Sequence, residues 1–99
     1  MIDKIFLETL KILENLIKFQ TVSGASNIDL IKYCEEILSK SRAKSFKTFN
    51  KSSTQANLFS TIEAENKDQK GIVLSGHTDV VPAVPGDWSS DPYIALKKD

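Results

Sequence analysis

The sequence predicts an α/β fold in which two helices are followed by about three strands of an incomplete sheet. In the first 40 residues, apolar side chains recur at every third or fourth position, which is the period of a helix with one buried face. Further along, residues 43–49 and 57–63 tend to alternate between apolar and polar side chains, and residues 71–76 form a compact apolar run. Helices followed by strands in this order suit a layer of helices packed on a sheet.

The first helix is expected over residues 3–18. Lysine and glutamate separate its apolar residues, so one face of the helix would be buried and the other exposed. The apolar positions are Ile5, Phe6, Leu10, Leu13, Leu16 and Ile17. Gly24 and small polar neighbours break this period over residues 21–26.

A second helix is expected to begin after that break. Ser26 or Asn27 can cap it, because a short polar side chain accepts a hydrogen bond from a free N–H group in the first turn of a helix. Asp29 would lie in that first turn. The buried stripe of this helix is expected to contain Ile28, Ile31, Cys34 or Tyr33, Ile37 and Leu38.

Three strands are expected after the helices. In the first, residues 43–49, the pattern predicts Phe46 as an inward side chain, and the second covers residues 57–63. The third, residues 71–76, is apolar throughout its centre, which predicts a strand buried on both faces. After Pro82, a segment with two further prolines and a glycine predicts an ordered loop.

Composition indicates an ordinary globular chain and argues against several classes of partner. Of the 99 residues, 40% are apolar and 26% are charged, and 13 basic and 13 acidic side chains cancel. No basic stripe with interleaved aromatic residues suggests nucleic acid as a partner, and no apolar run is long enough for a membrane span or a signal peptide. The single cysteine, Cys34, cannot form an internal disulfide, which favours a cytoplasmic location.

The candidate site follows the third expected strand. His77 is the only histidine, and Asp79 lies two residues further on. Because successive side chains of an extended segment point to opposite faces, these two residues share a face and can meet. A metal-bound imidazole is usually held by a carboxylate on its other ring nitrogen, and ligands of open α/β sheets bind beyond the carboxyl ends of strands. We therefore expect His77 to ligate a metal and Asp79 to orient it.

Each candidate residue also has a purely structural interpretation. His77 can be a core or surface histidine that makes an ordinary hydrogen bond. Cys34 is expected to be a small core residue rather than a nucleophile, since it lies on the apolar stripe of its helix. Trp88 is expected to pack over the sheet rather than line a pocket, and Asp87 and Asp91 are expected to be solvated or to cap turns.

The motif extends into longer segments of similarity. Ser75–Pro82, followed by Trp88–Tyr93, closely resembles the first metal-ligand motif of the dinuclear zinc amidohydrolases related to aminoacylase and carboxypeptidase G. Leu16–Ser23 and Ser26–Ile31 resemble the first helix, the Thr-Val-Ser turn and the start of the second helix of the acetylornithine deacetylases within that family. The similarity covers nearly the whole chain, and the succinyl-diaminopimelate desuccinylases are the nearest alternative.

The resemblance implies a fold, an activity and two site residues. The fold is the amino-terminal part of a three-layer, zinc-peptidase-like catalytic domain, and the activity is hydrolysis of N-acetyl-L-ornithine to acetate and ornithine in arginine biosynthesis. His77 matches the histidine that ligates one of two zinc ions, with cobalt as an alternative metal, and Asp79 matches the catalytic-site aspartate that orients this histidine. In that family the two metals activate a bridging water, with a glutamate as general base, for attack on the amide carbonyl of an acyl amino acid.

Residues 1–99 match only the amino-terminal fragment of that catalytic domain. The family's bridging aspartate, glutamate pair, further acidic ligand, last histidine and lid and dimerisation domain would all follow Asp99. A zinc site takes about four ligands, or three and a water when it is catalytic. The chain is therefore expected to be inactive alone, either as part of a split enzyme with a separately encoded carboxyl-terminal fragment or as the remnant of a disrupted gene. A sheet cut off after three strands is expected to leave an unpaired edge. A non-enzymatic interaction domain on the same scaffold is the alternative.

Overall fold

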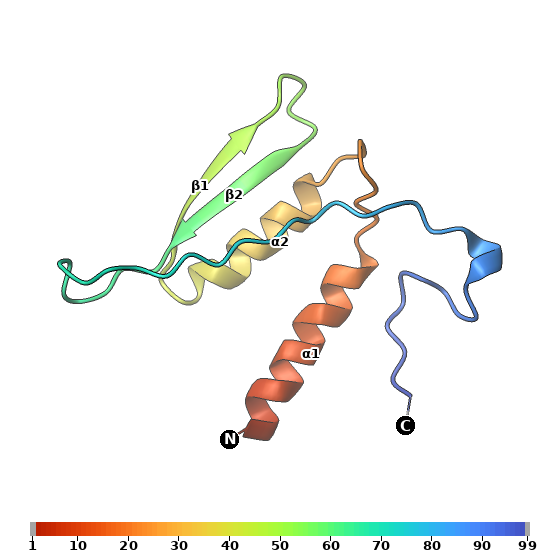
Figure 1. The fold of residues 1–99 in the computed structure, drawn as a ribbon, viewed down its shortest axis with the longest axis horizontal. Coiled ribbons are helices and arrows are strands. Elements are labelled where there is room, and N and C mark those ends of the chain that lie inside the picture. Colours follow the sequence, from red (N-terminus) through yellow and green to blue (C-terminus); the bar gives the residue numbers. More distant parts are fainter. Residues whose placement is uncertain (1, 99) are drawn as a thin grey trace.

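The computed structural model describes residues 2–98 as two helices, a β-hairpin and a long carboxyl-terminal segment (Figure 1). The elements are α1 (Ile2–Lys18), α2 (Ile28–Ser39), β1 (Lys44–Phe49), β2 (Ala56–Thr61) and a short 3-10 helix, η1 (Pro85–Asp87). Both helices and the first two strands are confirmed close to their expected positions. Neither α1 nor α2 has the length and apolar character that crossing a membrane requires.

A small core forms where α2 packs against the hairpin. Leu30 and Ile31 on α2 are each 4% exposed, and Ala56, at the start of β2, is 5% exposed. The partly buried residues around them are Leu16, Phe19, Ile28, Cys34 and Leu58. Leu30 lies outside the stripe expected for this helix. It is buried because apolar residues reach α2 both from the hairpin and from the end of α1, so more than one stripe is covered.

One face of the hairpin is covered by α2, and the register of the strands identifies the residues on that face. β1 and β2 pair antiparallel, with Lys47 opposite Leu58 and Phe46 opposite Phe59. Opposed residues share a face, and Leu58 packs on the core, so Lys47 lies on the covered side and Phe46 on the other. The prediction that Phe46 points inward is therefore wrong. The inward side of β1 instead carries an ion pair, in which Lys47 Nζ lies 3.1 Å from Glu35 Oε1 of α2.

The third expected strand does not form within the described residues. Residues 71–76 run as an extended segment that passes α2 (Figure 1), but they join neither edge of the hairpin. Ile72 and Leu74 are 90% and 92% exposed, so the prediction of a strand buried on both faces is wrong for this part of the chain. A strand needs a hydrogen-bonded neighbour, and residues 62–70 lead the chain away from the hairpin before this segment begins. The sheet is thus incomplete, as expected, with two strands.

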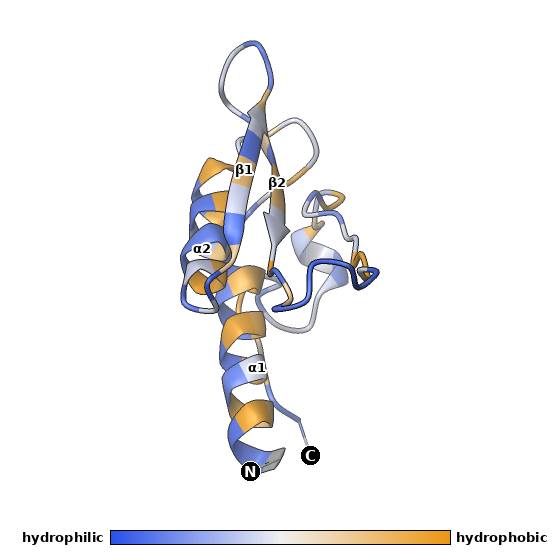
Figure 2. Ribbon diagram, turned by 90° about the vertical axis from the view of Figure 1, so that its left-hand side faces the viewer, coloured by the Kyte–Doolittle hydropathy of each residue, from blue (hydrophilic) through white to orange (hydrophobic). Residues whose placement is uncertain are grey.

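The apolar face of α1 is largely uncovered in the part of the chain that the structure describes. Ile5, Phe6 and Leu13 are exposed, whereas Leu16, near the end of the helix, packs against the core. Figure 2 shows these apolar bands along α1, which projects beyond the hairpin. The expectation that the whole face is buried therefore holds only at the carboxyl-terminal end of the helix.

The carboxyl-terminal segment is a loop around η1, as predicted, but Trp88 does not cover the hairpin. Its half-exposed ring lines an apolar groove together with Leu16, Val81 and Pro92. The expectation that Trp88 packs over the sheet is wrong, because the loop lies beside the end of α1 and away from β1 and β2 (Figure 1). Asp91 caps a turn as expected, since its Oδ1 accepts a hydrogen bond from the backbone N–H of Tyr93 at 2.9 Å.

Candidate metal centre

The candidate site rests on the loop that joins α1 to α2, residues 19–27, which we call the anchor loop. Within it, Val22 forms a parallel bridge with Val80. The N–H of Ser23 donates to the carbonyl oxygen of Val80, and the N–H of Val80 donates to the carbonyl oxygen of Thr21, both at 3.0 Å. These bonds fix the backbone of residues 78–80 directly beside the anchor loop.

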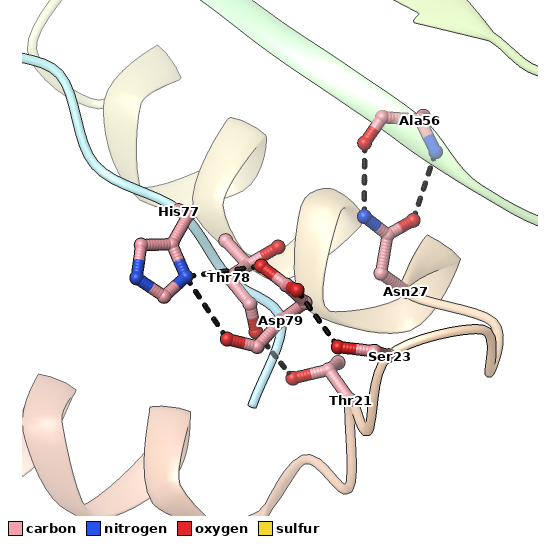
Figure 3. Close-up of polar contacts among 7 residues, drawn as sticks. All are labelled: Thr21, Ser23, Asn27, Ala56, His77, Thr78 and Asp79. Atoms are coloured by element: carbon pink, nitrogen blue, oxygen red, sulfur yellow. Dashed lines mark hydrogen bonds and ion pairs between the residues drawn. The ribbon is translucent and has the colours of Figure 1, made fainter. Parts of the chain in front are cut away.

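Thr21 adds a side-chain contact to this bridge. Its Oγ1 donates to the carbonyl oxygen of Thr78 at 2.6 Å. Thr21 is 5% exposed, and a buried hydroxyl group needs a partner because its removal from water is otherwise costly. The Thr78 carbonyl supplies that partner, so Thr21 holds the backbone of the residue between His77 and Asp79 (Figure 3).

The other end of the anchor loop is attached to β2 by Asn27. The side chain of Asn27 donates through Nδ2 to the carbonyl oxygen of Ala56 at 2.9 Å and accepts through Oδ1 from the N–H of Ala56 at 2.8 Å. Asn27 occupies the N-cap position of α2, as expected, but its side chain makes no capping bond there. Its amide group instead joins the anchor loop to the hairpin, so the loop is held on both sides.

His77 and Asp79 meet as the two-residue spacing predicts. His77 Nδ1 lies 3.0 Å from Asp79 Oδ1 and 3.0 Å from the Asp79 carbonyl oxygen. A carboxylate and a carbonyl oxygen can only accept hydrogen bonds, so the hydrogen of a neutral imidazole belongs on Nδ1. The lone pair then lies on Nε2, which is the atom available to a metal. The imidazole is 84% exposed, so Nε2 is open to an incoming group (Figure 3).

The second oxygen of the same carboxylate is bound from the opposite side. Ser23 Oγ donates to Asp79 Oδ2 at 2.8 Å. The Ser23 hydroxyl, followed by the His77 imidazole, lowers the pKa of Asp79 from its usual value, because both groups stabilise the ionised carboxylate. Asp79 is therefore an anion at neutral pH, in the state that holds the Nδ1 hydrogen of His77.

Cys34 takes no part in this network. It is partly buried beside the core on α2, and burial raises the pKa of its thiol, which disfavours the nucleophilic thiolate. This agrees with the expectation of a small core residue. Cys34 also lines the groove of about 830 Å³ that runs past His77 and Asp79 between α2 and the hairpin.

The donor set fits one arm of a metal site. Within residues 2–98, no three side chains among histidine, cysteine, aspartate and glutamate gather closely enough to hold a metal ion. His77 offers a correctly oriented imidazole nitrogen, and Asp79 supplies the carboxylate that such ligands carry on their other nitrogen. The described residues therefore offer one imidazole nitrogen backed by a carboxylate, whereas a zinc site takes three or more protein ligands.

Two residues of this network were not predicted as part of the site. The sequence predicts Thr21 and Ser23 as part of a break between two helices and, by resemblance, of a Thr-Val-Ser turn, but not as contacts of His77 and Asp79. Their partners lie 57 and 56 positions further along the chain, which no local pattern reveals. Comparison of the chain with family models, with curated proteins and with solved structures gives no match.

Proposed function

We propose that this chain supplies one metal-ligand arm, His77 held by Asp79, of a dinuclear zinc amidohydrolase that hydrolyses N-acetyl-L-ornithine to acetate and ornithine. The observation that carries the proposal is the contact of His77 Nδ1 with a carboxylate, which favours the Nδ1–H tautomer of the neutral ring and leaves Nε2 as the free nitrogen beside the groove. The resemblance of residues 75–82 to the first ligand motif of that family supports the same role for both residues.

The chemistry divides between the metals and the residues of this chain. When bound, zinc polarises the amide carbonyl and makes a water nucleophilic at neutral pH. His77 would contribute its Nε2 lone pair as a ligand. Asp79 would keep the ring in one orientation and one tautomer and would supply a negative charge close to the ligand. Ser23 and Thr21 fix the segment that carries both residues.

The remaining ligands and the general base are proposed to come from outside residues 2–98. Catalytic zinc takes about three protein ligands, and the described residues bring one. We propose a carboxyl-terminal catalytic segment, in the same protein or separately encoded, that completes the site over the groove. The 99-residue chain alone would then lack deacetylase activity.

Complementation tests this function. The purified chain is mixed with the carboxyl-terminal segment of an acetylornithine deacetylase in the presence of Zn²⁺, and acetate release from N-acetyl-L-ornithine is measured. We expect turnover in the mixture, none with either part alone, and loss of turnover with His77→Ala or Asp79→Asn. Asp87→Asn, which changes an exposed carboxylate outside the network, serves as the matched control.

Three outcomes decide against the proposal or against its substrate. Turnover that is equal with His77→Ala, or no turnover although the two parts co-purify, contradicts the metal-ligand role. N-succinyl-diaminopimelate is assayed in parallel. Faster hydrolysis of that compound would favour the desuccinylase alternative while preserving the role of His77.

A specific observation favours a second candidate, a non-enzymatic interaction domain. Large apolar side chains are exposed on several elements, including Ile5 and Phe6 on α1 and Ile72 and Leu74 in the extended segment. Large apolar side chains exposed together suit contact with another polypeptide. This candidate predicts that a specific partner binds with unchanged affinity after His77→Ala and Asp79→Asn.

A further inference from the structure

The carboxylate of Asp79 is held by two donors on its two separate oxygens. Its Oδ1 faces His77 Nδ1 at 3.0 Å, while its Oδ2 accepts from Ser23 Oγ at 2.8 Å (Figure 3). The three side chains therefore form one line of hydrogen bonds, from hydroxyl to carboxylate to imidazole. Ser23 lies 56 positions before Asp79 in the sequence, so the line joins two distant segments.

The backbone of Ser23 is itself fixed. Its N–H donates to the carbonyl oxygen of Val80 at 3.0 Å, and the neighbouring residue Val22 forms the bridge to Val80. The Ser23 hydroxyl is thus carried by a backbone that is hydrogen-bonded to the segment of Asp79. A hydroxyl on such a fixed backbone can restrict the rotation of the Asp79 carboxylate, whereas a hydroxyl on a mobile loop would move together with the carboxylate.

Asp79 needs such restriction because it is poorly enclosed. Its side chain is 61% exposed, so packing does not select its rotamer. Water competes for each of its hydrogen bonds, and a carboxylate that rotates away would leave the Asp79 carbonyl oxygen, also 3.0 Å from His77 Nδ1, as the remaining acceptor for the ring.

We infer that Ser23 is a positioning residue, whose hydroxyl holds Asp79 in the rotamer that keeps the hydrogen of neutral His77 on Nδ1 and leaves Nε2 free. The inference rests on the proposed function for its purpose, since a free Nε2 serves a metal ligand. Its test uses no metal and no turnover. Ser23 is called a positioning residue because its side chain contacts Asp79 and reaches His77 only through that carboxylate.

The test measures the tautomer of His77 in the 99-residue chain by ¹⁵N nuclear magnetic resonance, at a pH where the ring is neutral. His77 is the only histidine, so the imidazole nitrogen signals need no further assignment. We expect the Nδ1–H form to predominate in the unmodified chain. In Ser23→Ala the ratio of Nδ1–H to Nε2–H should fall by about fivefold, the size of effect that one hydrogen bond has on an equilibrium.

Two matched variants separate positioning from a general structural effect. Ser23→Thr keeps a hydroxyl donor and should retain the ratio of the unmodified chain. Ser45→Ala removes the hydroxyl that contacts Ser60 in the hairpin and should leave the ratio unchanged. If Ser23→Ala does not fold, Ser23→Cys replaces it, because a thiol of similar size is only a weak donor.

An unchanged ratio in a folded Ser23→Ala or Ser23→Cys chain would overturn the inference, as would an equal loss in Ser23→Thr or in Ser45→Ala. The failure of this inference is distinct from failure of the proposed function. A predominant Nδ1–H form that depends on Ser23, without turnover after complementation, would reject the function and keep the positioning role. Zinc-dependent turnover with a tautomer ratio that does not depend on Ser23 would keep the proposed function and reject the positioning role.

Discussion

The side-chain amide of Asn27 binds both backbone groups of Ala56, donating to its carbonyl oxygen at 2.9 Å and accepting from its N–H at 2.8 Å. The amide thereby acts like a short additional strand at the start of β2. Because the anchor loop carries Thr21 and Ser23 at its other end, this contact connects the hairpin with the segment of His77 and Asp79.

Asn27→Ala should lower the free energy of unfolding by about 1–3 kcal/mol, because it leaves two backbone groups of a buried residue without their partner. Urea unfolding followed by circular dichroism measures the change. Asn57→Ala, at an exposed position on the same strand, is the matched control and should cost less than about 0.5 kcal/mol. Equal effects of the two variants would show that the Asn27 contact contributes nothing.

Leu30→Ala should destabilise the chain by about 2–4 kcal/mol, since Leu30 is one of the most buried side chains and its truncation leaves a cavity. In a chain with so small a core, we expect the cooperative urea transition to weaken or disappear. Leu7→Ala removes the same atoms from an exposed position on α1 and should leave the transition in place. A Leu30→Ala chain as stable as Leu7→Ala would contradict the core described here.

Replacing both Ile72 and Leu74 with threonine should reduce self-association without loss of stability. These side chains are 90% and 92% exposed in an extended segment whose backbone can pair with another chain. Light scattering as a function of concentration measures association, and binding of an apolar dye measures exposed apolar surface. The free energy of unfolding should change by no more than about 0.5 kcal/mol, as for ordinary surface substitutions. A large loss of stability would mean that the segment is buried in solution.

Alkylation of Cys34 should be slower in the folded chain than in urea, and the difference should narrow as the pH rises. Burial raises the pKa of the thiol, so the folded chain keeps a proton that the unfolded chain releases first. The protonated thiol of the folded chain therefore contributes to the free energy of unfolding. That contribution is complete below the ordinary thiol pKa and is lost as the pH rises through the raised value. In a Cys34→Ala chain, Ser41→Cys places the only thiol at an exposed position and should show little difference on unfolding.

The helices and the first two strands could be predicted because their patterns are local. The spacing of Leu16 and Ile31 with their neighbours marks helical faces, and the same locality applies to the meeting of His77 and Asp79, which lie two residues apart. Within such a range the chain has few ways to arrange itself, so residue type and spacing nearly determine the outcome.

The parts that could not be predicted depend on which distant segments come together. Alternation in β1 shows that Phe46 and Lys47 face opposite ways, but it does not show which face α2 covers. An apolar run such as residues 71–76 indicates a preference for strand, yet a strand forms only beside a hydrogen-bonded neighbour. The role of Ser23 depends in the same way on a partner 56 positions away.

We expect the bridge between the anchor loop and residues 78–80 to form late in folding. The contact of His77 with Asp79 closes almost no loop, whereas the bond from Thr21 to Thr78 must close one of 57 positions. Loop closure costs entropy that only the finished contacts repay, and contacts between distant residues therefore slow folding. During refolding, the helix signal should appear before the amide hydrogen of Val80 becomes protected from exchange, so the histidine acquires its support only in the last steps.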